Sequence, residues 1–264
     1  MFSLTQRAQA LCKAFDAHET LISLAYNGQR ELLGVMHTQT ISWEDLQEID
    51  RQKQAVMQNM QRFMAGQSYN HMLLWGARGT GKSSLVRALF VHIKSQGQPL
   101  KLVQLGIEDL DNMAFLLWAM AQHSARFLVF IDDLSFAEED GRYRALKAVL
   151  EGSIAGIGRN VMLCVTSNRR HLLAQTSQTI QARHPEEDDE EHISLSDRFG
   201  LRLAFHRLSQ AQYLDLLAYL FTREGFILDE QAKRQALQYA MARGSRSGRI
   251  AQQFLYQYQP ISTQ

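Results

Sequence analysis

The stretch MLLWGARGTGKSSLVRALF, residues 72–90, places three glycines around a lysine, between an apolar run and a segment with helical periodicity. Glycine costs stability inside regular elements, so this cluster indicates that the backbone must approach another group closely. Residues Gly76–Ser83 match the phosphate-binding loop pattern in full. A strand is expected before the loop and a helix after it, which is the context that the pattern requires. The alternative is a glycine-rich turn that fits by chance.

Each residue type in this loop suits a bound phosphate. Backbone N–H groups curl around an anion only through conformations closed to residues with a Cβ, which accounts for the glycines. The following helix directs its free N–H groups and positive dipole end at the same point. We expect Lys82 to reach the β- and γ-phosphates of ATP and the Ser83 hydroxyl to bind Mg²⁺. The expected nucleotide contacts of the loop are Gly76, Ala77, Arg78, Gly79, Thr80, Gly81, Lys82, Ser83 and Ser84.

A second motif, FLVFIDDLSF at residues 127–136, ends an apolar strand in two carboxylates. The carboxyl ends of parallel strands share one edge of a sheet, so these carboxylates should lie beside the loop. We expect Asp132 to hold Mg²⁺ through water and Asp133 to orient or deprotonate the attacking water. The alternative is an acidic turn after a strand.

A third strand, VMLCVT at residues 161–166, is followed by Asn168, whose amide could bond the γ-phosphate or the attacking water. Taken alone, such an asparagine is more often a helix cap or a turn residue. Arg198 precedes the last expected strand, which places it away from the chain's own loop and within reach of a neighbouring copy. Arg249 lies near the start of the last expected helix, where it could face the phosphates. Each arginine alone is more often a surface charge.

The rest of the chain predicts an α/β fold with three parts. Short apolar runs alternate with helical patterns, which indicates a parallel sheet covered on both faces. We expect a helical N-terminal segment at 1–45, an α/β nucleotide-binding domain at 46–206 and a helical lid domain at 207–264. The acidic run at 184–192 is expected to be a solvated loop. The five expected strands are residues 71–75, 100–105, 127–131, 161–166 and 201–206.

Composition excludes several classes of protein. The 264 residues are 45% hydrophobic and 21% charged, with a formal net charge of +1, which gives no global attraction to nucleic acid or membrane. Cys12 and Cys164 lack the spacing of a zinc site or disulfide framework. The longest apolar stretch is far short of the roughly 20 residues that span a bilayer. The N-terminus lacks the apolar core of a secretory signal, so we expect a cytoplasmic protein without membrane contact.

With these motifs in order, the chain resembles the AAA+ ATPases over residues 46–258. The family's Walker A, Walker B, sensor 1, arginine finger and sensor 2 fall on Gly76–Ser83, Asp132 with Asp133, Asn168, Arg198 and Arg249. DDLSF, TSNRRHL, SLSDRFGL and GSRSGR resemble one bacterial AAA+ family known as a domain of unknown function. Most hydrolysing AAA+ proteins have Glu in place of Asp133, whereas Asp is usual in that bacterial family. The resemblance implies a five-stranded parallel sheet of order 5-1-4-3-2, with nucleotide between the sheet domain and the lid.

The resemblance implies ATP and Mg²⁺ binding, slow hydrolysis and a homo-oligomeric ring or spiral that remodels or loads a partner. Threading of polypeptides is disfavoured, because QLGIEDLDNM at 104–113 is acidic and lacks the aromatic residue of a pore loop. The chain after Glu230 has basic but no acidic residues, which suits phosphate contact and a nucleic-acid client. The alternative is a nucleotide-gated switch that binds a protein and turns over slowly. The sequence leaves both open.

Overall fold

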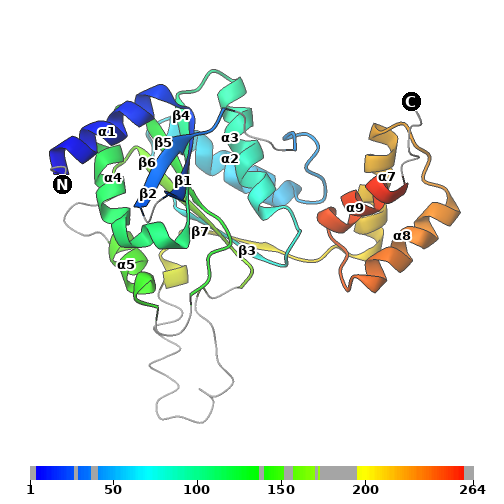
Figure 1. Ribbon diagram of the computed structural model, residues 1–264. Helices are drawn as coiled ribbons and strands as arrows, with labels where there is room; N and C mark the ends of the chain where they lie inside the picture. The colour runs from blue at the N-terminus through cyan, green and yellow to red at the C-terminus, as the bar shows by residue number, and fades with distance from the viewer. Residues whose placement is uncertain are drawn as a thin grey trace, which may run out of the picture.

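The computed structural model describes residues 4–26, 29–36, 41–136, 140–151, 157–169, 172 and 195–258 (Figure 1). The acidic run at 184–192 lies outside these residues. The elements are α1 (Leu4–Ala17), β1 (Thr20–Tyr26), β2 (Gln29–Gly34), α2 (Asp50–Met64), β3 (Met72–Gly76), α3 (Lys82–Ser95), β4 (Leu100–Leu105), the 3₁₀ helix η1 (Ile107–Asn112), α4 (Met113–Ala121), β5 (Arg126–Ile131), α5 (Gly141–Leu150), β6 (Val161–Ser167), β7 (Leu201–Phe205), α7 (Gln210–Arg223), α8 (Glu230–Ala242) and α9 (Gly248–Tyr258).

The sheet of the described chain has seven strands in the order β2-β1-β4-β5-β6-β3-β7. The strands from β4 to β7 are parallel to their neighbours, as expected. The prediction of five strands is wrong, and the order 5-1-4-3-2 describes only β3 to β7. A hairpin adds two strands beyond β4: β1 is parallel to β4 and antiparallel to β2.

The same hairpin corrects the prediction of a helical N-terminal segment, which holds only for α1. Residues Thr20–Tyr26 and Gln29–Gly34 form strands because β1 extends the free edge of β4. Leu24 and Leu33 remain 46% and 44% exposed at this edge, so the hairpin lacks the clean apolar and polar alternation of a half-buried strand. The pairing partner, rather than the local pattern, decides the conformation.

A buried carboxylate fastens the hairpin to the segment after β4. Asp109 is 3% exposed and accepts hydrogen bonds from Ser23 Oγ at 2.6 Å, from the Gly106 backbone N–H at 2.7 Å and from Arg30 Nη2 at 2.9 Å. The side-chain hydrogen bond with Asp109 is the largest cause that raises the pKa of Arg30. Because the ion pair is hydrogen-bonded on several sides, it holds the two added strands in register with the parallel sheet.

Helices cover both faces of the sheet, and strand alternation explains why. In β5, Phe127 and Val129 join the core beneath α1, α4 and α5, whereas Leu128 and Phe130 join the core beneath α2 and α3. Successive strand residues point to opposite faces, so an uninterrupted apolar strand requires two covered faces. Figure 1 shows these two helical layers on either side of the strands.

The C-terminal helices α7, α8 and α9 form their own core around Tyr213, Leu217 and Phe221, each 0% exposed. The side chains of Ser209 and Asp229 cap the N-termini of α7 and α8. A short connection after β7 joins this helical cluster to the sheet (Figure 1). No described helix is long and apolar enough to cross a bilayer.

A partly buried histidine, His71, stands just before β3 and makes stability depend on pH. Burial lowers the pKa of His71 to about 4, while its Nδ1 accepts the Leu163 backbone N–H at 3.2 Å. The unfolded chain, with a histidine pKa near 6.5, binds a proton in a range where the folded chain does not. The free energy of unfolding should therefore fall as pH decreases through this window, by roughly 2 kcal/mol between about pH 7 and pH 5 from this group.

The measurement is the difference in unfolding free energy between His71→Asn and the unaltered chain across that pH range. Asn has no titrating group, so its curve should be flatter by the amount that His71 contributes. His206→Asn is the matched control, because His206 is exposed. Parallel curves for the His71 variant and the unaltered chain would show that His71 is not the titrating group.

Candidate nucleotide site

The loop between β3 and α3 adopts backbone conformations that favour glycine. Gly76, Gly79 and Gly81 have φ angles of 133°, 75° and 96°. At Gly76 an added Cβ would lie 2.0 Å from the Phe205 carbonyl oxygen of the neighbouring strand. Positive φ and this close approach are the reasons for glycine that the sequence pattern predicts. The loop therefore has the backbone of an anion-binding turn at the N-terminus of a helix.

The Lys82 ammonium lies inside the loop and is only 7% exposed. Its Nζ donates to the carbonyl oxygens of Gly76 at 2.7 Å and Ala77 at 2.8 Å, and to Asn168 Oδ1 at 3.2 Å. Burial lowers the pKa of Lys82; Asp133 and Asp132 oppose this effect, and Arg249 adds to it. All three hydrogen-bond acceptors are uncharged, so the positive charge remains available to an anion.

Three oxygen-bearing side chains meet where a divalent cation would be needed. Ser83 Oγ, at the start of α3, donates to Asp132 Oδ1 at 2.5 Å, and Thr166 Oγ1, on β6, donates to the same oxygen at 2.6 Å. A hydroxyl and a carboxylate next to a phosphate loop are a donor set that suits Mg²⁺. These residues fit the metal that the motifs imply.

Asp133 occupies a strained position beside this pair. Its φ of 52° is one of two positive values recorded for non-glycine residues in the described chain. Thr166 Oγ1 accepts its backbone N–H at 2.9 Å, and its carboxylate accepts a hydrogen bond from Asn168 Nδ2. Arg78 lies 3.9 Å from its other oxygen. Strained backbone conformations that are held by surrounding contacts cluster at functional sites, which supports a functional role for the Asp133 carboxylate.

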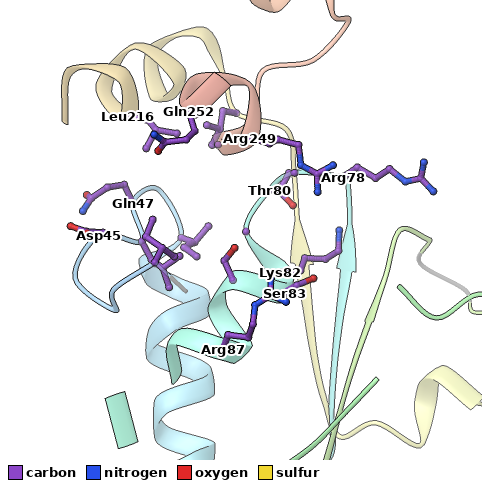
Figure 2. Close-up of a pocket in the computed structure, with 18 of the residues that line it drawn as sticks. Asp45, Gln47, Arg78, Thr80, Lys82, Ser83, Arg87, Leu216, Arg249 and Gln252 are labelled. Atoms are coloured by element: carbon purple, nitrogen blue, oxygen red, sulfur yellow. The ribbon is translucent and has the colours of Figure 1, made fainter. Parts of the chain in front are cut away.

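The C-terminal helical cluster, α7 to α9, also contacts the phosphate loop. The Arg249 backbone N–H lies 3.4 Å from the Gly79 carbonyl oxygen, and an added Cβ at Gly79 would lie 2.9 Å from Ser247 Oγ. Figure 2 shows the Arg249 side chain above the loop that carries Thr80 and Lys82. The start of α9 thus packs directly on the phosphate loop.

A pocket of about 1130 Å³ lies between the loop, the segment 41–49 and the helical cluster. Figure 2 shows Lys82 and Ser83 on one side of it and Leu216 and Gln252 on another. Its polar and charged lining comprises Ser42, Asp45, Gln47, Arg78, Thr80, Lys82, Ser83, Ser84, Arg87, Asp132, Asp133, Thr166, Asn168, Arg223, Arg249 and Gln252. The structure therefore brings together the predicted residues of three strand ends with Arg249.

Three predicted residues lie elsewhere. Gly76 and Ala77 do not line the pocket but hold Lys82 through their carbonyl oxygens. Arg198 precedes β7 at the end of the sheet opposite the loop, because Leu201 pairs with Met72 at the start of β3. Its Nη2 lies 3.1 Å from Glu151 Oε1, at the end of α5.

The sequence patterns did not predict the wall of the pocket that the segment 41–49 and α7 form. Asp45 accepts a hydrogen bond from Tyr219 Oη and lies 3.4 Å from Arg223, so the segment before α2 is joined to α7. The sequence patterns also did not single out Thr166, which is buried and whose hydroxyl bonds both Asp132 and the Asp133 backbone N–H. The feature that could have indicated it is a hydroxyl residue near the end of an apolar strand, next to the strand that precedes Asp132.

The model of one protein family, described as "Protein of unknown function (DUF815)", matches residues 18–260. The chain belongs to the DUF815 family. A comparison with curated proteins gives no match.

Solved structures resemble this DUF815 protein at low sequence identity. The Aeropyrum pernix ORC1 protein in complex with DNA matches with 16% identity and a TM-score of 0.52, covering 78% of this chain and 57% of that one. The replication initiator DnaA bound to AMPPCP and single-stranded DNA matches with 13% identity and a TM-score of 0.50, covering 78% and 60%. Thermotoga maritima RuvB R170A gives 13% identity, a TM-score of 0.45 and coverage of 81% and 71%. The matches to ORC1 and DnaA show that the DUF815 chain shares their fold, and it spans about three fifths of the length of these two relatives.

Proposed function

We propose that this DUF815 protein binds ATP with Mg²⁺ and hydrolyses it slowly, and that its nucleotide state drives self-assembly and the loading or remodelling of a partner. One observation carries the proposal: Asn168 bonds Lys82 on one side and Asp133 on the other. The cation of the loop and the candidate water-binding carboxylate are thus joined by the residue that follows β6. These are the parts that phosphoryl transfer to water needs.

The end of the pocket formed by the loop binds the phosphates of ATP and supplies positive charge to them. Loop N–H groups and Lys82 bind the β- and γ-phosphates, and Arg249 adds a second cation from α9. Ser83 and Asp132 hold Mg²⁺, with Asp132 acting through water. When bound, the metal neutralises charge on the phosphate oxygens. Gly79, Thr80, Gly81 and the first turn of α3, including Ser84, complete the anion site.

Asp133 orients the attacking water and accepts its proton, while Asn168 fixes the carboxylate and bonds the γ-phosphate. The water oxygen bonds to the γ-phosphorus as the bond to the β–γ bridging oxygen breaks, giving ADP and phosphate. One feature favours slow turnover. The Asp133 side chain is one methylene shorter than the usual Glu, so it holds the attacking water less closely.

Assembly and domain roles follow from the same geometry. We treat residues 46–206 as the nucleotide-binding domain and 207–264 as a lid, with 1–45 extending the sheet edge. Arg198 lies away from its own pocket, so it serves as an arginine finger only for a neighbouring copy. Such an interface is head-to-tail and builds a ring or a spiral.

The client of the assembly is proposed to be nucleic acid or a protein bound to it. The similar ORC1 and DnaA structures are complexes with DNA, which favours this class. The second candidate is a nucleotide-gated switch with little turnover, and the short Asp133 side chain in place of the usual Glu favours it. A cytoplasmic location stays a prediction.

Lys82→Ala tests ATP binding. The substitution removes the cation that faces two phosphates, so we expect ATP affinity to fall about 100-fold, equivalent to about 3 kcal/mol. Calorimetric titration with ATP and Mg²⁺ measures the change. Lys94→Ala is the matched control on the same helix, where Lys94 pairs with Glu19 at 2.7 Å. Unchanged affinity of the Lys82 variant would contradict the assignment of the loop.

A further inference from the structure

The described part of the lid carries an uneven distribution of charge. Residues 207–258 contain seven Lys and Arg residues against four Asp and Glu residues, and 231–258 contain no acidic residue. Three of the four acidic residues lie in or beside the α7–α8 connection, at Glu224, Asp229 and Glu230. This connection is separated from the start of α7 by a helix of 14 residues, about 21 Å long. Negative charge is therefore concentrated at one end of the lid.

The other end is built from the connection after β7 and the turn between α8 and α9. Arg207 Nη1 donates to the Gly244 carbonyl oxygen at 3.2 Å, and the Leu208 backbone N–H donates to the Arg246 carbonyl oxygen at 3.2 Å. Arg246 Nε returns a bond to the Leu208 carbonyl oxygen at 3.3 Å. Figure 1 shows this end of the lid beside the segment that leaves β7. Two distant segments thus bring Arg207, Arg243 and Arg246 together, and we call these three residues the basic lid end.

The guanidinium groups of the basic lid end retain most of their hydrogen-bonding capacity. All three residues are exposed, and among described residues none forms an ion pair with a carboxylate. Arg207 and Arg246 each use one donor on a backbone carbonyl, and the Arg243 guanidinium lies 4.2 Å from the centre of the Tyr239 ring. A guanidinium has five N–H donors, so several remain on each. Carbonyl and ring contacts orient the groups without neutralising them.

The basic lid end adjoins the nucleotide site, because Arg246 bonds the pocket residue Leu208, but its arginines do not line the pocket. The pocket is lined by Arg78, Arg87, Arg223 and Arg249, and none of the three arginines of the basic lid end is among its residues. Binding of ATP therefore leaves this second set of cations unneutralised. A gathering of like charges costs free energy until an anion joins it, which indicates an external anionic partner.

We propose that the basic lid end binds the phosphate backbone of a nucleic acid; this inference rests on the proposed nucleic-acid-associated function. Planar guanidinium forks match phosphate oxygens in pairs. An acidic protein partner would require buried aromatic or apolar anchors within its interface. Near the α8–α9 turn, Met241 is the exposed large hydrophobic residue, whereas Ile227, Tyr256 and Tyr258 lie elsewhere in the described lid. Three cations beside a single exposed apolar side chain suit phosphate contacts, which need no set of apolar anchors.

The test uses the full chain and fluorescein-labelled single-stranded and duplex DNA of about 20 nucleotides, a length within reach of several phosphate contacts. Anisotropy is measured over a range of salt concentrations. The variant R207Q/R243Q/R246Q keeps hydrogen-bond donors but removes three charges. We expect it to bind single-stranded DNA roughly 10- to 100-fold more weakly at low salt, with a salt slope smaller by about 2.

Three controls accompany this variant. K233Q/R234Q removes two charges elsewhere on α8 and should leave the slope nearly unchanged. R207K/R243K/R246K keeps the charges and should keep the slope. Calorimetric ATP binding and the unfolding midpoint, measured on every variant, should match those of the unaltered chain.

Several outcomes would overturn the inference. One is an unchanged salt dependence of DNA affinity in R207Q/R243Q/R246Q, and another is an equal loss of DNA affinity in K233Q/R234Q. A third is an unaltered chain that binds ATP but shows no detectable binding to DNA. Displacement of DNA by polyglutamate at equal charge would instead assign the surface to an acidic protein. If the unaltered chain bound DNA but not ATP, the proposed ATPase function would be contradicted. The assignment of the basic lid end as a DNA-binding surface would still hold.

Discussion

Asp133→Asn should bind ATP as tightly as the unaltered chain and hydrolyse it about 10²- to 10⁴-fold more slowly, the range for loss of a general base. The substitution is conservative at this position. Asparagine tolerates the positive φ of 52° as well as aspartate does, and its Oδ1 can still accept the hydrogen bond from Asn168. The backbone N–H still bonds Thr166 Oγ1. Only the negative charge that receives the proton from water is removed.

Single-turnover hydrolysis of radiolabelled ATP measures this rate without a contribution from product release. Asp111→Asn is the control, because Asp111 is exposed and lies outside the pocket. Asp133→Glu keeps a carboxylate and should retain measurable turnover. Hydrolysis at the parental rate in Asp133→Asn would place the base on another residue, and it would remove the reason to treat Asp133 as the functional counterpart of the usual Glu.

The parts of the fold that the sequence predicted are those with short-range causes. The loop at Gly76–Ser83 is specified by glycines whose positive φ angles the structure shows. The strands β3 to β6 contribute apolar residues to both faces, and this pattern alone requires helices above and below the sheet. Asp132 could be placed because a parallel sheet brings its strand end to the same edge as the loop.

The parts that were missed depend on contacts between distant segments. The β1–β2 hairpin is stabilised by pairing with β4 and by Asp109, more than 70 residues away from Arg30 in sequence. Asp45 reaches Tyr219 across 174 positions, and neither residue belongs to a motif. Thr166 resembles any β-branched strand residue until its hydroxyl is found against Asp132. Such contacts form only in the assembled fold, so a local sequence pattern does not predict them.

Arg198→Ala should lower the ATPase rate of the assembled protein by about 10³- to 10⁵-fold, the effect of losing an arginine finger supplied by a neighbour. Among the residues that the structure describes, Arg198 forms an ion pair with Glu151 at 3.1 Å, an exposed contact that adds little stability. Its side chain is 48% exposed and does not line the pocket of its own chain. The residue is therefore available to a second copy at low cost.

Glu151→Gln separates the two roles of Arg198. If the arginine serves only its ion pair, loss of Glu151 should reproduce the effect of losing Arg198. If it acts on a neighbouring nucleotide, Glu151→Gln should keep most of the ATPase activity. Arg202→Ala is a second control, since Arg202 is an exposed arginine nearby that pairs with Asp197.

Mixing Lys82→Ala subunits with Arg198→Ala subunits should restore activity that neither variant has alone. In a head-to-tail assembly, an Arg198→Ala subunit supplies an intact loop, and the adjacent Lys82→Ala subunit supplies an intact finger to it. At an equal ratio, roughly a quarter of the interfaces should have this arrangement, so activity should approach that fraction of the parental value. Light scattering with ATP measures assembly in the same samples. A protein that stays monomeric in ATP, with no recovery at any mixing ratio, would leave Arg198 as a surface charge paired with Glu151. Recovery without assembly would contradict the proposal as well, because a finger can act in trans only where two copies meet.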